Sequence, residues 1–126
     1  MYTEIEVPRE QFDRICGELV RWLAQGNDFF CVITDDLRCV QAAHSGDPDL
    51  VLHLEAVVGA DDPPPRWPEG LRVTSLDLGQ VIAYTSEVPT ALAALVCRHL
   101  LEELPPPAPV LGLRLQGHAS LMPTIG

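Results

Sequence analysis

Lysine is absent from this 126-residue sequence. Its eight basic residues are all arginines, spread singly among 18 Asp and Glu residues, and the formal net charge is −10. Nucleic acids and anionic lipid surfaces are bound through clustered Lys and Arg, so this charge balance argues against both partners. A basic protein is the better-matched partner, because carboxylates steer a positively charged surface into contact.

Signals for export and for membrane insertion are also lacking. The first six residues have neither the basic region nor the apolar region of a signal peptide. The longest uninterrupted apolar run, residues 91–97, is far shorter than the roughly 20 residues that a membrane-spanning helix needs. We therefore expect a cytoplasmic protein that does not associate with membranes.

The four cysteines form no C-x-x-C pair, and a secreted disulfide scaffold would be shorter and richer in cysteine. Cys16 and Cys97 lie on the apolar faces of predicted helices, where burial disfavours the reactive thiolate. Cys31 and Cys39 flank one predicted turn, which would make them cross-strand neighbours. The cysteine pattern therefore predicts free thiols and does not indicate thiol catalysis.

The apolar content and the length of the chain are typical of one folded domain. Apolar residues make up 47% of the chain, which excludes a disordered acidic tail. The length suits one hydrophobic core. We expect a single domain over residues 1–116, followed by a flexible tail over residues 117–126.

Hydrophobic periodicity predicts an α+β fold. Alternating residues indicate strands, and apolar residues at steps of three and four indicate two amphipathic helices. The order β-α-β-β-β-β-β-α-β favours an antiparallel sheet with both helices packed on it. The predicted strands are residues 3–7, 29–33, 38–43, 50–58, 71–77, 80–85 and 110–115, and the predicted helices are residues 8–25 and 89–104.

A proline-rich segment, residues 59–70, separates two predicted hairpins and is expected to be an extended surface loop. It carries Arg66 and Trp67, two residue types enriched at binding hot spots. Trp67 could instead fold back as a lid over the sheet edge. Asp61 and Asp62 in the same loop are candidates for steering a basic partner.

The second predicted helix has no polar residue between Ala91 and Cys97. A helix that is apolar on all sides must be covered on more than one side. It is either central to the core or shared with a second subunit or a partner. Leu92 and Leu95 are the candidate contact residues.

Motifs for phosphate binding are missing, since the sequence has neither G-x-G-x-x-G nor the lysine of a P-loop. Metal binding has one candidate cluster within ten residues, formed by His44, Asp47, Asp49 and His53. Asp47 and Asp49 flank a proline, which is also ordinary turn chemistry. We expect no cofactor and no bound metal.

The order of elements resembles the class I type III secretion chaperones and their fold relatives. The segments that carry the resemblance are the predicted meander "FFCVITDDLRCVQAAHSGDPDLVLHLEAVV", the hairpin "LRVTSLDLGQVIAYTS" and the closing helix "PTALAALVCRHLLEEL". The resemblance implies a small acidic bacterial protein that forms a homodimer, holds an extended segment of another protein and catalyses no reaction. Prolines 63–65 occupy the place of a helix that this family uses at its dimer contact.

These observations predict a non-enzymatic adaptor that binds a basic protein, either chaperone-like or immunity- or antitoxin-like. The predicted partner-binding residues are Arg66, Trp67, Leu92, Leu95, Asp61 and Asp62. The alternative is a small metal-assisted or small-molecule-binding enzyme centred on His44, Asp49 and His53.

Overall fold

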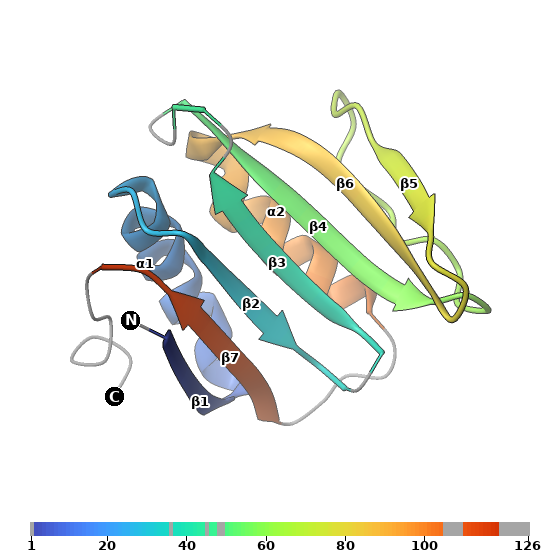
Figure 1. Ribbon diagram of the computed structural model, residues 1–126, viewed down its shortest axis with the longest axis horizontal. Helices are drawn as coiled ribbons and strands as arrows, with labels where there is room; N and C mark the ends of the chain where they lie inside the picture. The colour runs from blue at the N-terminus through green and yellow to red at the C-terminus, as the bar shows by residue number, and fades with distance from the viewer. Residues whose placement is uncertain (1, 36, 45, 48–49, 105–109, 119–126) are drawn as a thin grey trace.

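The computed structural model describes residues 2–35, 37–44, 46–47, 50–104 and 110–118 (Figure 1). The observed order of strands and helices confirms the predicted α+β class. The strands are β1 (Tyr2–Pro8), β2 (Phe29–Ile33), β3 (Cys39–His44), β4 (Val51–Gly59), β5 (Thr74–Asp77), β6 (Val81–Pro89) and β7 (Val110–Gln116). The helices are α1 (Phe12–Ala24), preceded by a 3₁₀ turn at Arg9–Gln11, and α2 (Thr90–Glu103).

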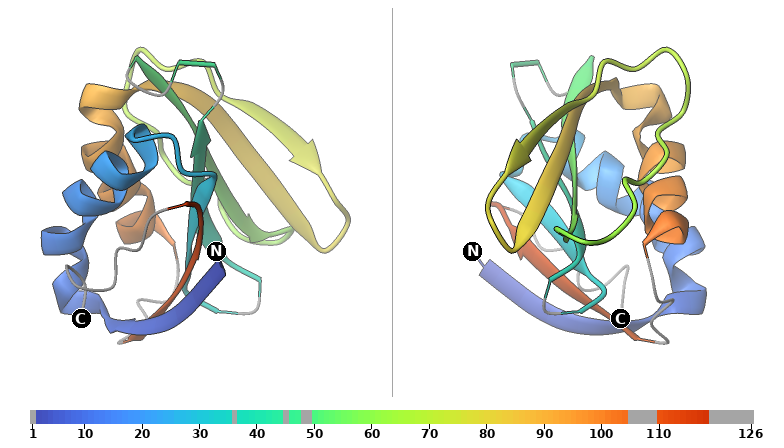
Figure 2. Two further views of the ribbon diagram at one scale, coloured as in Figure 1. Left: turned by 60° about the vertical axis from the view of Figure 1, so that its left-hand side comes forward. Right: turned by 90° about the vertical axis from the view of Figure 1, so that its right-hand side faces the viewer.

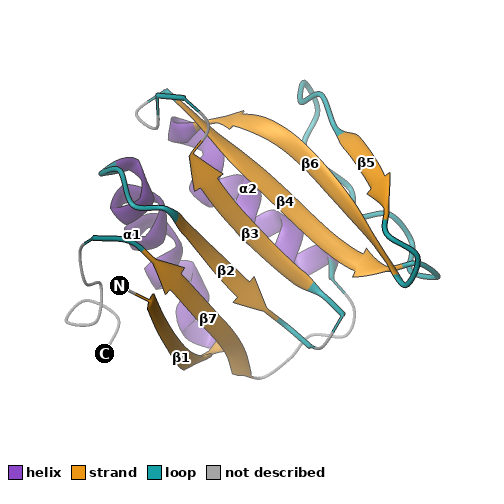
Figure 3. Cartoon of the chain, viewed as in Figure 1, coloured by secondary structure: helices purple, strands orange, loops and turns teal. Residues whose placement is uncertain are grey.

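The seven strands form one antiparallel sheet in the order β1-β7-β2-β3-β4-β6-β5 (Figure 3). The last strand, β7, lies between β1 and β2, where Leu113 is opposite both Ile5 and Val32. The first and last strands are therefore paired with each other, and β5 and β1 are the edges of the sheet within the described residues.

Both helices lie on the same face of the sheet (Figure 2). They meet each other where the Cys16 thiol donates to the Ala94 carbonyl oxygen, at 2.9 Å. Alternate residues of β4, including Leu52 and Leu54, point toward the helices and are fully buried. We call the opposite side of the sheet the open face, because neither helix covers it.

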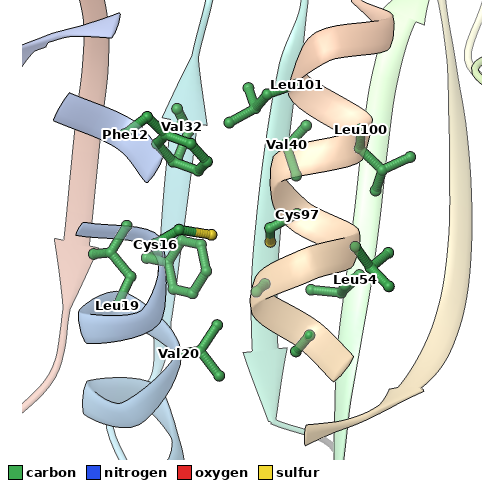
Figure 4. Close-up of a cluster of buried hydrophobic side chains, with 14 of the residues drawn as sticks. Phe12, Cys16, Leu19, Val20, Val32, Val40, Leu54, Cys97, Leu100 and Leu101 are labelled. Atoms are coloured by element: carbon green, nitrogen blue, oxygen red, sulfur yellow. The ribbon is translucent and has the colours of Figure 1, made fainter. Parts of the chain in front are cut away.

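The core lies between the helices and the sheet. Large apolar side chains from each layer interlock there and account for most of the driving force of folding. The residues labelled in Figure 4 are Phe12, Cys16, Leu19 and Val20 from α1, Val32, Val40 and Leu54 from the sheet, and Cys97, Leu100 and Leu101 from α2.

Two turns are set by glycine in the left-handed region. Gly26, with φ of 98°, follows α1 and ends the helix. Gly79, with φ of 93°, is the first central residue of the two-residue turn from β5 to β6, which suits a type II′ hairpin. Residues 71–73, predicted as the start of a strand, lie outside β5, which has four residues.

The structure bears on two further predictions. Among the described residues, no helix has the length and apolar character needed to cross a membrane. The predicted tail begins with two described residues, and the His118 backbone N–H donates to the buried side chain of Asn27 at 2.9 Å. The rest of that tail lies outside the described residues.

Candidate protein-binding surface

Strand β5 forms an open edge of the sheet. It pairs with β6 and with no other strand in the part of the chain that the structure describes. All four of its residues are exposed. Figure 2, in its right-hand view, shows β5 in front with no strand beyond it.

Large apolar side chains are exposed along this edge. Leu76 is 60% exposed and Leu78, directly after the strand, is 57% exposed. Leu76 lies opposite Ala83 on the open face, next to a threonine pair, Thr74 and Thr85, whose hydroxyl groups are 2.8 Å apart. Residues 74–78 are called the β5 edge below.

The hydrogen-bond pattern shows which backbone groups of the β5 edge point outward. The Leu78 N–H donates to the Val81 carbonyl at 2.9 Å, so these two residues form a hydrogen-bonded pair. Hydrogen-bonded and non-hydrogen-bonded pairs alternate along an antiparallel ladder. Ser75 and Asp77 therefore belong to non-hydrogen-bonded pairs, so their backbone N–H and C=O groups point away from β6. Such groups are a template for another strand.

The opposite edge, β1, has a different character. It carries Glu4 and Glu6 and ends at Pro8. Glu4 also forms an ion pair with Arg114, at 3.0 Å. Charges and proline on an edge discourage pairing with another chain, so β5 is the edge better suited to strand addition.

The two predicted steering carboxylates have different environments. They lie in a turn fastened to the β5–β6 hairpin by a hydrogen bond of 2.9 Å from the Ala60 N–H to the Gln80 carbonyl. Asp62 accepts from Arg38 at 2.7 and 2.8 Å and from the Gly59 N–H at 2.7 Å, and these bonds hold its pKa below the usual range. Asp61 is exposed and lines the same cleft as Asp62, beside Gly79 and Gln80.

Arg66 and Trp67 lie together on the loop that follows this turn, and that loop packs against α2. The Arg66 backbone N–H and Nε both donate to Glu103, at 2.9 and 3.1 Å, and the Arg66 carbonyl is 2.7 Å from His99 Nε2. The pKa of Glu103 is lowered by the side-chain hydrogen bond from Arg66. The Arg66 side chain nevertheless remains 85% exposed.

Trp67 is partly buried and packs against the core. The loop therefore folds back, which was one of the two alternatives considered for Trp67. It folds onto the helical side of the molecule, however, where Arg66 contacts α2. The Trp67 indole N–H is shielded from solvent and has no hydrogen-bond partner among the described residues.

Helix α2 divides its apolar residues between two faces. Ala93, Val96 and Cys97 are buried against the sheet and α1. Leu92 and Leu95 are 49% and 54% exposed. His99 and Glu103 follow Leu92 and Leu95 at helical spacing, so the four residues form one stripe along α2. The loop that carries Arg66 contacts His99 and Glu103 and therefore covers the far end of this stripe.

The two histidines of the predicted metal cluster are separated. His53 lies opposite Ala43 on the open face, whereas His44 lies opposite Leu52, one position along, and so belongs to the helix-covered face. His53 Nδ1 is instead 2.8 Å from a Glu87 carboxylate oxygen. Asp49 lies outside the described residues. Within those residues, no three His, Cys, Asp or Glu side chains are grouped so that they could hold a metal ion.

Sequence reasoning did not identify the β5 edge as a candidate site. The sequence predicts a strand over residues 71–77 followed by a hairpin turn, which does not show on which side the strand has a neighbour. Its position at the edge depends on β6 pairing with β4 on its other side, which is a long-range property.

Comparison with known proteins adds no relative: no family model, no curated protein and no solved structure matches this chain.

Proposed function

We propose that this protein is a non-enzymatic adaptor that holds an extended segment of a basic partner protein, in the manner of a secretion chaperone or of an immunity or antitoxin protein. The observation that carries the proposal is the β5 edge. It combines outward-pointing backbone groups at Ser75 and Asp77 with two exposed leucines. Addition of a strand to such an edge is a recurrent way of binding an extended peptide.

Affinity and specificity would come from different groups. Backbone hydrogen bonds to Ser75 and Asp77 give sequence-independent affinity, while Leu76 and Leu78 select apolar side chains in the partner. A solvent-exposed leucine contributes favourable free energy when a partner removes it from water.

Charge would guide the encounter. Asp77 and Asp61 are exposed near the β5–β6 turn, and the whole chain carries a formal charge of −10. A segment rich in Lys or Arg would be attracted to this end of the sheet, and added salt would slow its association.

The exposed stripe on α2 is a second proposed contact. Leu92 and Leu95 present exposed apolar area on α2, and this helix lies on the helical side of the molecule, away from β5 (Figure 2). A second copy of the chain or a folded part of the partner would bind there, since a helix face accepts a complementary apolar surface.

The test begins by identifying the partner through a photo-crosslinking amino acid at position 76 in the source cell. The partner is then purified, and its affinity is measured by calorimetry for the wild type, Ser75→Pro and the matched control Ser75→Ala. Proline removes an outward N–H and no ladder bond, so the fold is retained while strand addition is blocked. We expect Ser75→Pro to weaken binding by at least about tenfold and Ser75→Ala to bind as the wild type does.

The proposal requires this difference between proline and alanine. Equal affinities for all three proteins would rule out the β5 edge, and loss of binding only in Leu92→Asn/Leu95→Asn would transfer the site to α2. A crosslinked partner with no measurable affinity as a purified protein would contradict the adaptor function itself.

A further inference from the structure

Cys31 and Cys39 are brought together on the open face of the sheet. In the β2–β3 register, Cys31 lies opposite Gln41 and Cys39 lies opposite Ile33. The two cysteines are thus diagonal neighbours on the same face of the sheet. The two thiols influence each other, since the side chain of Cys39 lowers the pKa of Cys31 and that of Cys31 raises the pKa of Cys39.

We infer that this pair is a redox modification site: a small hydroperoxide oxidises Cys31, and Cys39 resolves the product into an intrachain disulfide. The inference is independent of the proposed adaptor function. It rests on the placement of two thiols and one guanidinium group on strands β2, β3 and β7.

The surroundings of Cys31 favour its thiolate. The side chain of Cys39 lowers the pKa of Cys31, burial opposes this, and the guanidinium group of Arg114, which is opposite Cys31 on β7, lowers it further. Glu55 is the acidic group near the pair and raises the pKa. The interaction with Cys31 raises the pKa of Cys39, so the two thiols have different roles.

The other two cysteines are unsuited to this chemistry. Cys16 and Cys97 lie in the core between the helices and the sheet. Burial raises the pKa of Cys16 to about 12 and that of Cys97 well above its usual value. A reactive cysteine needs thiolate character and access. Cys31 has the lowered pKa, and it lies on the side of the sheet that neither helix covers.

Access favours a small oxidant. Cys31 is 8% exposed and Cys39 is partly exposed, and neither helix covers their face of the sheet. Hydrogen peroxide is small enough to approach a sulfur atom with so little exposed surface. A bulky disulfide such as oxidised glutathione would have to displace the neighbouring side chains.

The reaction balances in two steps. The Cys31 thiolate attacks one peroxide oxygen, an S–O bond forms, the O–O bond breaks, and the leaving oxygen takes up a proton to become water. The Cys39 sulfur then attacks the Cys31 sulfenic acid, an S–S bond forms, and the S–O bond breaks with release of a second water. Two thiols are oxidised to one disulfide, and one hydrogen peroxide is reduced to two waters.

The experiment treats the reduced full-length protein with hydrogen peroxide and maps the thiols by mass spectrometry. Trypsin cleaves after Arg38, between the two cysteines, so an intrachain disulfide joins peptides 22–38 and 39–66. We expect this linked pair in the wild type and in Cys16→Ser. In Cys39→Ser, Cys31 should accumulate as a sulfenic acid that dimedone traps. Cys31→Ser should slow oxidation of Cys39 by about tenfold or more.

A measurement on the wild type alone keeps the inference falsifiable if a variant fails to fold. Iodoacetamide should alkylate Cys31 at neutral pH well before Cys16 or Cys97. Oxidation first at Cys16 or Cys97, disulfides only between different molecules, or an unchanged Cys39 oxidation rate in folded Cys31→Ser would overturn the inference.

Discussion

Arg38 and Asp62 form a two-point ion pair: Nε and Nη2 of the arginine donate to the two carboxylate oxygens, at 2.7 and 2.8 Å. The same guanidinium group also donates to Asp35 through Nη1, at 2.7 Å. One arginine thereby fastens the β2–β3 turn to the turn after β4. Both side chains of the pair are mostly shielded, and such two-point geometry is stronger than a simple surface contact.

Asp62→Asn is predicted to lower the stability of the protein at neutral pH. The pKa of Asp62 is held below its ordinary value by the Arg38 hydrogen bond, so the ionised form stabilises the fold above about pH 4. This contribution is lost as pH falls through the lowered native pKa, where the wild type also becomes protonated. The difference in urea midpoint between wild type and variant should therefore be largest at neutral pH and shrink below about pH 4.

Asp61→Asn is the matched control, because it removes the same charge from an exposed neighbour. It should change the urea midpoint little at any pH. Equal effects of the two substitutions would show that Asp62 acts through overall charge and not through Arg38.

Gly117→Ala is predicted to destabilise the protein through Asn27. A Cβ atom at position 117 would lie 2.6 Å from the Asn27 Cβ, closer than real contacts allow. Asn27 is fully buried, and its side chain bonds the Trp22 carbonyl at 2.6 Å and the His118 N–H at 2.9 Å. We expect the free energy of unfolding to fall by about 2 kcal/mol in a urea titration.

Gly112→Ala provides the comparison, since a Cβ atom there would meet the Ile33 Cβ at 3.5 Å, an ordinary contact. This variant should be as stable as the wild type. If both glycine variants lose the same free energy, the cause is a general effect of alanine in this segment and not the Asn27 contact.

The types and order of the elements could be predicted because they depend on local spacing. Steps of three and four, as from Phe12 to Leu23, define α1, and Gly79 defines a hairpin turn. Strand neighbours could not be predicted in this way. The pairing of Ile5 with Leu113 joins residues from opposite ends of the chain, and many apolar strands would have matched equally well.

The candidate site likewise combines features that the sequence could predict with others that depend on long-range contacts. Exposure of Leu92 and Leu95 was one of two alternatives for an apolar helix, and only packing against α1 and the sheet decides between them. Arg66 and Asp62 were chosen from the sequence as partner-binding residues, yet both have intramolecular partners. Such ion pairs depend on which loops meet, and composition does not reveal that.

Added zinc is predicted not to stabilise the protein through His44 and His53. The two side chains belong to opposite faces of the sheet, so they cannot share one ion while the sheet is intact. Thermal unfolding in stoichiometric Zn²⁺ should match unfolding in a chelator. A saturable rise in Tm that disappears in both His44→Ala and His53→Ala would favour the alternative of a metal-assisted enzyme.

Leu95→Asp is predicted to leave the fold intact, and this outcome bears on whether α2 is available to a partner. The Leu95 side chain is 54% exposed, so the substitution should cost less than about 1 kcal/mol, mostly from the lower helix propensity of Asp. Leu100→Ala, at a fully buried position of the same helix, should cost about 3 kcal/mol.

Urea titrations of both variants, with light scattering over a range of concentrations, measure stability and oligomeric state together. If the stripe joins two copies of the chain, the wild type will be a dimer and Leu95→Asp a folded monomer. A loss of stability in Leu95→Asp as large as that in Leu100→Ala, with no change in mass, would instead place Leu95 in the core and remove it from the proposed contact surface.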